Sequence, residues 1–385
     1  MGAYHTILRW AVRGTAVTLA GAAVIFTMGA VRVADDSHPA DATASAFQPV
    51  AADQTALAEL AQMQDPATGL WPIAGTSGWW SSANDLTALI DASRALGTHQ
   101  YDSLIARTYT VYDRPAGGYP FRDFTNHYYD DSLWWGLAWL DAYQWTGDTR
   151  YLVTAEADDA YAHDARTTTA CGTAIPWAMS LIKNGDQFNA ITNELGLELS
   201  ASLATVTGRS TYRSEALADW AWLQRSGLIG ADGLVRDHLD VHCRPTGPAW
   251  SYTQGTISSA LVSLSMSTGM SGYLSTARHL ADTATTSSRL NPGGVLTDPC
   301  ELGGWCVVDG ATFKGADIRG LAALNRALPD HPHSSYLTHQ ATTMYEDDRM
   351  AGDVYGQHWA GAPDASNPAR QGSAVDLLTA TMEGA

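Results

Sequence analysis

Two adjacent aspartates lie among aromatic residues in the first half of the sequence. Asp130 and Asp131, the aspartate pair, occur in TNHYYDDSLWWGLAWLDAYQWTGDTRYL, followed closely by Trp134 and Trp135. Neighbouring carboxyls in surroundings of low polarity acquire different pKa values, so one keeps its proton near neutral pH while the other ionises. A retaining glycosidase needs this division between general acid and nucleophile. The pair therefore predicts a sugar-cleaving site, although one aspartate could simply cap the following helix.

Further polar and aromatic clusters precede other predicted helices. FNAITNELGLELS contains Asn189, and PAWSYTQGT contains Trp250, Tyr252 and Gln254. Amides and carboxylates can bond sugar hydroxyls, and flat aromatic faces can stack on sugar rings. The same residues could instead cap helices or fill the core. The candidate substrate-binding residues are Asn84, Trp134, Asn189, Asp237, Trp250, Tyr252, Gln254 and Arg319.

One pattern returns along the chain and predicts the elements that position these residues. An apolar helix ends at a glycine, three loop residues follow, and a tyrosine opens a second helix. The glycines lie 50, 61 and 61 residues apart, and a fifth copy lacks the glycine. The glycine and tyrosine positions are Gly97 and Tyr101, Gly147 and Tyr151, Gly208 and Tyr212, Gly269 and Tyr273, with Leu328 and Tyr336 in the fifth copy.

This regular period is typical of stacked helical hairpins. Five or six hairpins fit an all-α fold, an (α/α)6 barrel in a single domain, and an open helical solenoid is the alternative. The polar and aromatic clusters all precede presumed inner helices. In a closed ring of hairpins these loops meet at one rim, so we expect the candidate residues to surround one cleft.

The N-terminus has the pattern of an export signal. Arg9 and Arg13 precede an uncharged apolar stretch from Gly14 to Val31. This is typical of a secretory signal peptide and borderline in length for a membrane anchor. We interpret residues 1–46 as a signal peptide or N-terminal anchor with a short linker. The protein is expected to be secreted or extracellular, with anchoring at the N-terminus as the alternative.

Composition and charge narrow the class of ligand. Of the 385 residues, 45% are hydrophobic and 16% are charged, which is typical of a globular protein with a large core. The formal net charge of −18, without any basic run, disfavours binding to nucleic acid or to anionic lipid. A neutral substrate fits this balance better than a polyanion.

The four cysteines predict disulfides. An exported protein would pair Cys171, Cys243, Cys300 and Cys306, and four cysteines allow three connectivities. Cys300 and Cys306 are close enough in sequence to close a small loop, which would leave the other two to pair. None has a C-x-x-C spacing, so a structural zinc site is not expected.

The segment YYDDSLWWGLAWLDAYQWTGDTRYL resembles the hallmark segment of glycoside hydrolase family 76, the endo-α-1,6-mannanases. Six more segments match in order and extend the resemblance over about residues 70–380. These segments are WWSSANDLTALIDA, FNAITNELGLELS, SGLIGADGLVRDHL, WSYTQGT, FKGADIRGLAAL and QGSAVDLLTA.

The resemblance implies an (α/α)6 catalytic domain over residues 47–385 that hydrolyses internal α-1,6-mannosidic bonds with retention of configuration. Asp130 would be the nucleophile and Asp131 the general acid/base. The expected substrate is α-mannan or mannooligosaccharides. The resemblance implies no metal, organic cofactor or obligate protein partner, and we expect a monomer. It places four further residues in the sugar-binding cleft: Asp237, Trp250, Tyr252 and Gln254.

Several residues depart from the family pattern where sugar contacts are expected. The chain has Phe-Asn-Ala at Asn189, Asp-His-Leu at Asp237 and Tyr-Thr-Gln-Gly at Tyr252. The family often has Lys-Asn-Ala, Asp-Gly-Leu and Tyr-Asn-Gln-Gly there. Two alternatives therefore stay open, a non-catalytic glycan-binding protein and a wall transglycosidase of the same fold. An (α/α)6 enzyme acting on uronides would need a basic cleft, for which Arg319 is the main candidate.

Overall fold

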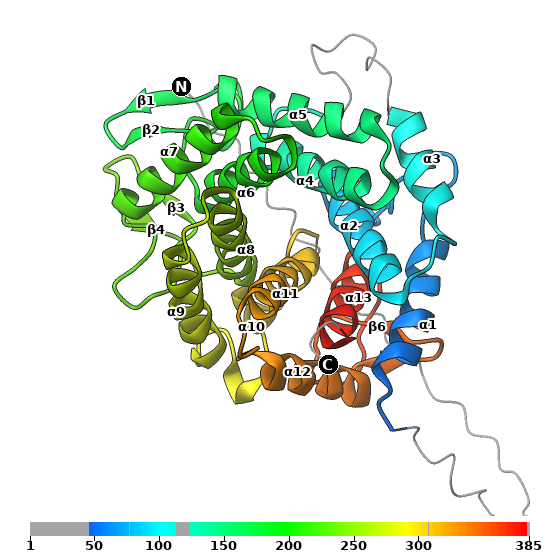
Figure 1. Cartoon of the computed structure of the whole chain (residues 1–385). Helices are drawn as coiled ribbons and strands as arrows, with labels where there is room; N and C mark the ends of the chain where they lie inside the picture. The colour runs from blue at the N-terminus through cyan, green and yellow to red at the C-terminus, as the bar shows by residue number, and fades with distance from the viewer. Residues whose placement is uncertain (1–45, 77, 113–123, 307, 383–385) are drawn as a thin grey trace, which may run out of the picture. The chain divides into compact units, whose positions relative to one another are not determined.

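Six helices form a closed inner ring in the computed structural model, which describes residues 46–76, 78–112, 124–306 and 308–382 (Figure 1). Each inner helix packs against the next, and the last packs against the first. The inner helices are α2 (Trp79–Leu96), α4 (Tyr129–Thr146), α6 (Ala190–Thr207), α8 (Ser251–Thr268), α11 (Gly310–Ala327) and α13 (Pro368–Met382). Closure of the ring rules out an open solenoid.

A second set of helices surrounds this ring. α5, α7 and α9 each pack on the inner helix that precedes them, and α1 packs against α13 and α2. At α3, Asp102 accepts a hydrogen bond of 2.9 Å from the indole N–H of Trp145 in α4. The outer helices are α1 (Pro49–Gln62), α3 (Asp102–Tyr112), α5 (Thr149–Asp164), α7 (Ser210–Ser226), α9 (Gly272–Thr286) and α12 (Ser334–Asp347). The predicted all-α (α/α)6 barrel is confirmed.

The remaining elements are short and lie in loops between the long helices. Consecutive strands pair to form three two-stranded antiparallel hairpins. They are β1 (Thr167–Thr169) with β2 (Gly172–Ala174), β3 (His238–Leu239) with β4 (Pro245–Thr246), and β5 (Arg349–Met350) with β6 (Val354–Tyr355). A 3-10 turn (Pro292–Gly294) and the short helix α10 (Pro299–Gly303) precede α11.

Small residues allow the inner helices to approach one another closely. Gly255 in α8 faces the backbone of Asp317 in α11, and Gly320 faces the backbone of Gly255 in turn, so a Cβ on either glycine would overlap the other helix. An inner helix has neighbours on several sides, and it therefore lacks a broad polar face. Gly147 ends α4 with a φ of 74°, and glycines in the same left-handed conformation end α2, α6 and α8, as the sequence predicts. In the fifth hairpin, α11 ends at Leu328 and not at a glycine.

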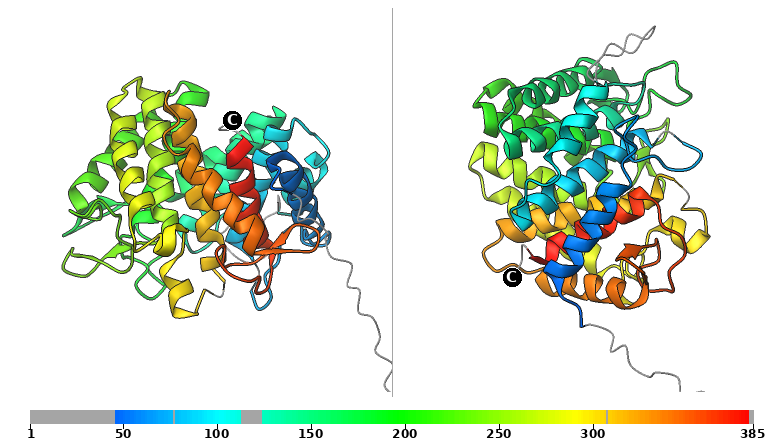
Figure 2. Two further views of the ribbon diagram at one scale, coloured as in Figure 1. Left: turned by 90° about the horizontal axis from the view of Figure 1, so that it is seen from below. Right: turned by 90° about the vertical axis from the view of Figure 1, so that its right-hand side faces the viewer.

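The two ends of the described chain close the barrel together. α1 lies beside α13, as the right-hand view of Figure 2 shows. The Gln371 side chain donates a hydrogen bond of 3.0 Å to the carbonyl oxygen of Ala56. Thr379 donates one of 3.1 Å to the buried carboxyl of Asp53. Ring closure thus depends on contacts between residues more than 300 positions apart.

The disulfides join Cys171 to Cys243 and Cys300 to Cys306. This is the pairing that sequence proximity favours. The first bond links the β1–β2 hairpin to the turn between β3 and β4, and the second closes the loop after α10.

Of residues 1–46, interpreted as a signal peptide or anchor with a linker, residues 1–45 lie outside the described residues. Residues 45–385 form one compact unit. Within the described residues, no helix combines the length and the apolar character that crossing a membrane requires.

Candidate active site

The aspartate pair lies in the first turn of α4. Tyr128 is the N-cap residue and makes no capping bond through its side chain, so neither aspartate occupies the cap position. The Asp130 carboxylate does accept the backbone N–H of Asp131 at 3.1 Å, one of the N–H groups that a helix start leaves without a partner. The capping hypothesis therefore accounts for one oxygen of Asp130 and for none of Asp131.

The two carboxyls have different hydrogen-bond donors. The indole N–H of Trp177 donates to Asp130 Oδ2 at 3.1 Å. The side-chain amide of Asn126 donates to Asp131 Oδ2 at 2.7 Å. Asn126 is itself fixed, because its Oδ1 accepts the backbone N–H of Tyr128 at 2.7 Å. Each carboxyl is thus oriented by its own partner.

Backbone pairing brings Trp177 to the aspartates. The N–H of Tyr129 donates to the Trp177 carbonyl at 3.0 Å, and the N–H of Met179 donates to the His127 carbonyl at 2.9 Å. The segment around Trp177 therefore runs alongside the start of α4. Its sequence, CGTAIPWAM, gives no local signal of this contact.

Burial raises the pKa values of both carboxyls. Burial raises the pKa of Asp130 to about 7, although the donors from Asp131 and Trp177 oppose the rise. Burial, followed by the negative charge of Asp130, raises the pKa of Asp131 well above its ordinary value. The charge of Asp309 adds to both shifts. The added repulsion from Asp130 favours the protonated form of Asp131, whereas the donors to Asp130 favour its ionised form.

The pair opens into a cavity of about 510 Å³. Its walls come from the starts of α2, α4, α6, α8 and α11 and from the loops that precede these helices. The starts of five of the six inner helices and the loops before them thus meet at this cavity, and no described residue of the loop before α13 lines it. The lining residues are Trp80, Tyr128, Asp130, Asp131, Trp134, Trp177, Gln187, Asn189, Asp237, His238, Tyr252, Asp309 and Phe313.

The cavity is aromatic and carboxylate-rich. Among its described lining residues there is no lysine and no arginine to pair with the carboxylate of a uronide. No group of three or more His, Cys, Asp or Glu side chains in the described ranges is placed to hold a metal ion. Carboxylates with aromatic walls suit a neutral sugar and the positive charge that develops on it during cleavage.

Six of the ten predicted site residues line this cavity, and four do not. Those that line it are Asp130, Asp131, Trp134, Asn189, Asp237 and Tyr252. Those outside its lining are Asn84, Trp250, Gln254 and Arg319.

Asn189 combines the two roles that the sequence left open. It is the N-cap of α6, where its Oδ1 accepts the backbone N–H of Thr192 at 3.3 Å, and it also lines the cavity. Asp237 likewise lines the cavity and lies 2.7 Å from Nδ1 of His238. His238, where the sequence resemblance implies a glycine, adds a polar group to the cavity wall.

Gln254 is a structural residue behind the cavity. Its Oε1 accepts the backbone N–H of Val235 at 2.9 Å, and its amide N–H groups donate to the carbonyls of Val235 and Trp250. Both ends of the side chain are thus occupied by backbone groups. Gln254 positions the segment that leads to Asp237 and does not face the cavity.

Asn84 and Arg319 contact each other inside the ring. Arg319 in α11 pairs with Asp376 in α13 and donates a hydrogen bond to Asn84 in α2. Arg319 lines a second cavity of about 500 Å³, formed by residues of α2, α4, α6, α8 and α11. Trp134 lines both cavities.

Two tryptophans with specific partners are absent from the sequence-based set. Trp177 donates to Asp130, as described above, and the indole N–H of Trp80 donates to Asp309 at 2.9 Å. Asp309 is the N-cap residue of α11, four residues before Phe313. Position along the chain was the one signal that could have identified them. Trp80 lies at the start of α2, and Trp177 pairs with the start of α4.

Comparison with known proteins agrees with this geometry. Residues 51–384 match the model of glycosyl hydrolase family 76. The chain belongs to glycosyl hydrolase family 76. It is 26% identical over 270 residues to a putative mannan endo-1,6-alpha-mannosidase of Schizosaccharomyces pombe, a match that covers 66% of this chain and 60% of that protein. With the mannan endo-1,6-alpha-mannosidase DCW1 of Saccharomyces cerevisiae it shares 23% over 268 residues, or 66% and 59% of the two chains.

Several solved structures share the fold. The GH76A alpha-1,6-mannanase of a Salegentibacter species superposes with a TM-score of 0.75 at 22% identity, covering 87% of this chain and 99% of that one. An inactive variant of that enzyme, altered at two consecutive aspartates, was solved with alpha-1,6-mannotetrose at the same TM-score of 0.75, 21% identity and the same 87% and 99% coverage. Dfg5 from Chaetomium thermophilum, in complex with glucosamine, gives 0.76 at 19% identity, covering 87% and 90%.

Proposed function

We propose that this family 76 chain is a retaining glycoside hydrolase that cleaves internal α-1,6-mannosidic bonds of mannan. The observation that carries the proposal is the aspartate pair, whose members share one cavity and have different donors and different pKa values. The names of relatives, which include endo-1,6-alpha-mannosidases, support the choice of linkage.

The proposed reaction has two steps. Asp131, protonated, gives its proton to the glycosidic oxygen while the Asp130 carboxylate attacks the anomeric carbon and the bond to the leaving sugar breaks. Asp131, now ionised, then takes a proton from water, and the resulting nucleophile displaces Asp130 from the same carbon. Two inversions at one carbon retain the configuration.

The surroundings of the pair support these roles. The indole N–H of Trp177 stabilises negative charge on Asp130, which the nucleophile must carry. Burial together with the charge of Asp130 keeps the proton on Asp131, which the acid must supply. The carboxylates of Asp237 and Asp309 face the same space and favour the cationic transition state.

The first prediction tests these roles directly. Asp130→Asn and Asp131→Asn should each lower kcat on linear α-1,6-mannan by roughly 10³-fold or more, because each removes a group that changes its bonding or its proton in the transition state. Circular dichroism should show an unchanged fold. Turnover near that of the wild type in either variant would contradict the assignment.

The products separate the alternatives that share this fold. Proton NMR should show the α-anomer as the first product formed, as retention requires. Products longer than an oligosaccharide substrate would instead identify a transglycosidase. Binding of mannan without any cleavage would support the glycan-binding alternative.

We also propose that the protein is secreted, with residues 1–46 as leader and linker and residues 47–385 as a monomeric catalytic domain. Two disulfides suit an oxidising compartment. N-terminal sequencing of protein recovered from culture medium would locate the cleavage site. Recovery in the membrane fraction with residue 1 still present would instead indicate an anchor.

A further inference from the structure

One tryptophan of the described chain is largely exposed. Trp305 follows α10, and 55% of it is accessible to solvent. No other tryptophan among the described residues is classed as exposed. Its indole packs edge-on against Trp250, with 5.6 Å between ring centroids and an angle of 82° between planes. Exposing an indole carries a hydrophobic cost, which makes the side chain a candidate for contact with a ligand.

Trp305 begins a row of aromatic rings that ends in the cavity. The ring centroids of Trp250 and Phe313 are 5.3 Å apart. Phe313 stacks on Tyr252, with 4.1 Å between ring centroids and 6° between ring planes. Phe313 and Tyr252 line the cavity that contains the aspartate pair. Four rings in contact thus connect the proposed catalytic cavity with the surface. We call them the aromatic row.

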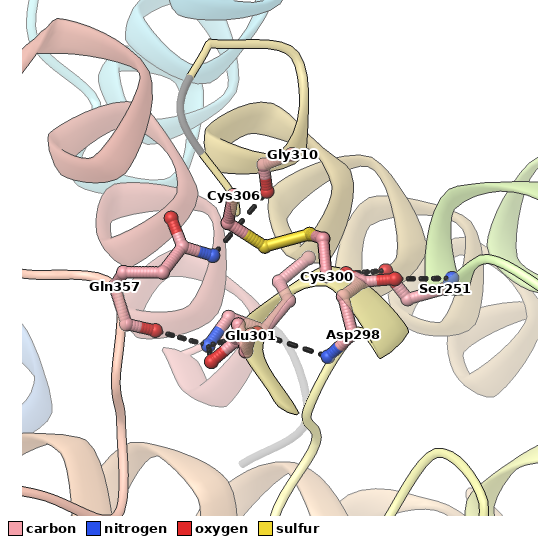
Figure 3. Close-up of a disulfide and its surroundings, with 8 residues drawn as sticks. Ser251, Asp298, Cys300, Glu301, Cys306, Gly310 and Gln357 are labelled. Atoms are coloured by element: carbon pink, nitrogen blue, oxygen red, sulfur yellow. Dashed lines mark hydrogen bonds and ion pairs between the residues drawn. A yellow bond between two sulfur atoms is a disulfide. The ribbon is translucent and has the colours of Figure 1, made fainter. Parts of the chain in front are cut away.

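The loop that carries Trp305 is held at several points. The disulfide between Cys300 and Cys306 closes it, with 4.9 Å between the Cα atoms (Figure 3). The backbone N–H of Trp305 donates to the Cys300 carbonyl at 3.0 Å. A Cβ on Gly303 would overlap the Trp305 indole, so glycine at this position allows the ring to lie over the loop.

The start of the loop is tied to α8 and α11. Asp298 accepts hydrogen bonds from the backbone N–H and the hydroxyl of Ser251, the residue after Trp250, at 2.9 and 2.6 Å (Figure 3). Glu301 forms a salt bridge of 3.1 Å with the buried Lys314, the residue after Phe313. The loop is therefore fixed beside both inner rings of the row, and a rigid ring loses little entropy on binding.

We propose that Trp305, with Trp250, forms a distal sugar-binding subsite for a mannosyl unit beyond those held in the cavity. The occupant is a neutral hexopyranosyl unit of the same mannan chain, whose C–H face stacks on the exposed indole. This inference rests on the proposed function. Trp305 takes no part in bond cleavage and acts through affinity for long chains.

The test compares substrates of increasing length. Trp305→Ala should lower kcat/KM on linear α-1,6-mannan by roughly tenfold, chiefly through KM, because one stacking contact is removed. On the shortest mannooligosaccharide that the wild type cleaves, activity should be unchanged, since such a substrate does not reach the loop. Trp305→Tyr should recover most of the loss. An equal loss at every length, or no loss at any length, would overturn the proposal.

Two further variants guard against a change in the loop itself. Leu302→Ala alters another exposed side chain of the same loop that is not part of the aromatic row, and it should leave both activities unchanged. Gly303→Ala should displace the indole and reproduce the length-dependent loss without removing the ring. Thermal melting would establish that each variant is folded. A length-dependent loss in Leu302→Ala would overturn the assignment to Trp305.

A binding measurement separates this inference from the proposed function. The double variant Asp130→Asn/Asp131→Asn, titrated calorimetrically with a long linear α-1,6-mannooligosaccharide, should bind roughly tenfold more tightly than the same protein with Trp305→Ala added. If the wild type cleaves no mannan, the proposed function fails while this titration still decides the subsite. Equal affinity of the two proteins would overturn the subsite.

Discussion

The properties of Asp130 and Asp131 follow from what surrounds each carboxyl. They are consecutive and chemically identical, yet one accepts from an indole and the other from an amide. The sequence sufficed to identify the pair and to predict unequal pKa values, because both follow from adjacency and aromatic neighbours. It could not identify Trp177 or Trp80 as partners, because those contacts arise only when distant loops meet.

These pKa shifts predict the pH dependence of activity. Asp130 must be ionised, so kcat/KM should fall as the pH drops below about 7, the value to which burial raises the pKa of Asp130. Asp131 must be protonated, so kcat/KM should also fall at higher pH, as the pKa of Asp131 is passed. Initial rates on linear α-1,6-mannan between pH 5 and pH 10 would test this bell shape.

An activated aryl α-mannoside that the wild type cleaves provides the control for this profile. Such a leaving group needs little protonation, so Asp131→Asn should keep the acidic limb and lose the alkaline one. A profile of Asp131→Asn with both limbs intact would show that another group supplies the proton.

At the scale of helices, the hairpin period and the glycine stops were readable from sequence. Local backbone geometry determines where each helix ends. Gly147, for example, ends α4 in the left-handed conformation that glycine adopts readily. The positions of Asn84 and Arg319 were not readable in this way. Both lie in inner helices, but Arg319 pairs with Asp376 and donates a hydrogen bond to Asn84 inside the ring, so neither lines the cavity of the aspartate pair.

The crossing of α8 and α11 makes a prediction about stability. Gly255→Ala should destabilise the protein by about 1–3 kcal/mol, because its Cβ would overlap the backbone of Asp317 and push the helices apart. Thermal unfolding would measure the loss. Gly272→Ala is the matched control, since a Cβ at the start of α9 meets no atom within 4 Å and should cost nothing. Equal melting temperatures for the two variants would contradict the close approach.

At the scale of the whole described chain, the period predicts hairpins but not the closure of their ring. Closure depends on α1 and α13, where Gln371 reaches Ala56 and Thr379 reaches Asp53. Neither contact leaves a local pattern in the sequence. The resemblance to family 76 supplied what periodicity could not decide, and the contacts around the ring agree with it.

The buried carboxyls of the barrel predict how its stability depends on pH. Burial raises the pKa values of Asp53 and Glu198 to about 7, and it raises that of Asp298 to about 6. An acid whose pKa is higher in the folded state binds more protons when folded, so its contribution is present at low pH and lost as pH rises through the folded pKa. The melting temperature should therefore decrease between pH 5 and pH 8. A melting temperature that rose over this interval would contradict the shifts.

Trp134 is a wall common to the two cavities, of about 510 and 500 Å³. One face of the aspartate-pair cavity and one face of the cavity that Arg319 lines therefore belong to the same residue. A short side chain at this one position would join them into a continuous passage within the helical ring. Water would then have a second route to the pair, so the size of the side chain at position 134 bears on how dry the proposed catalytic cavity stays.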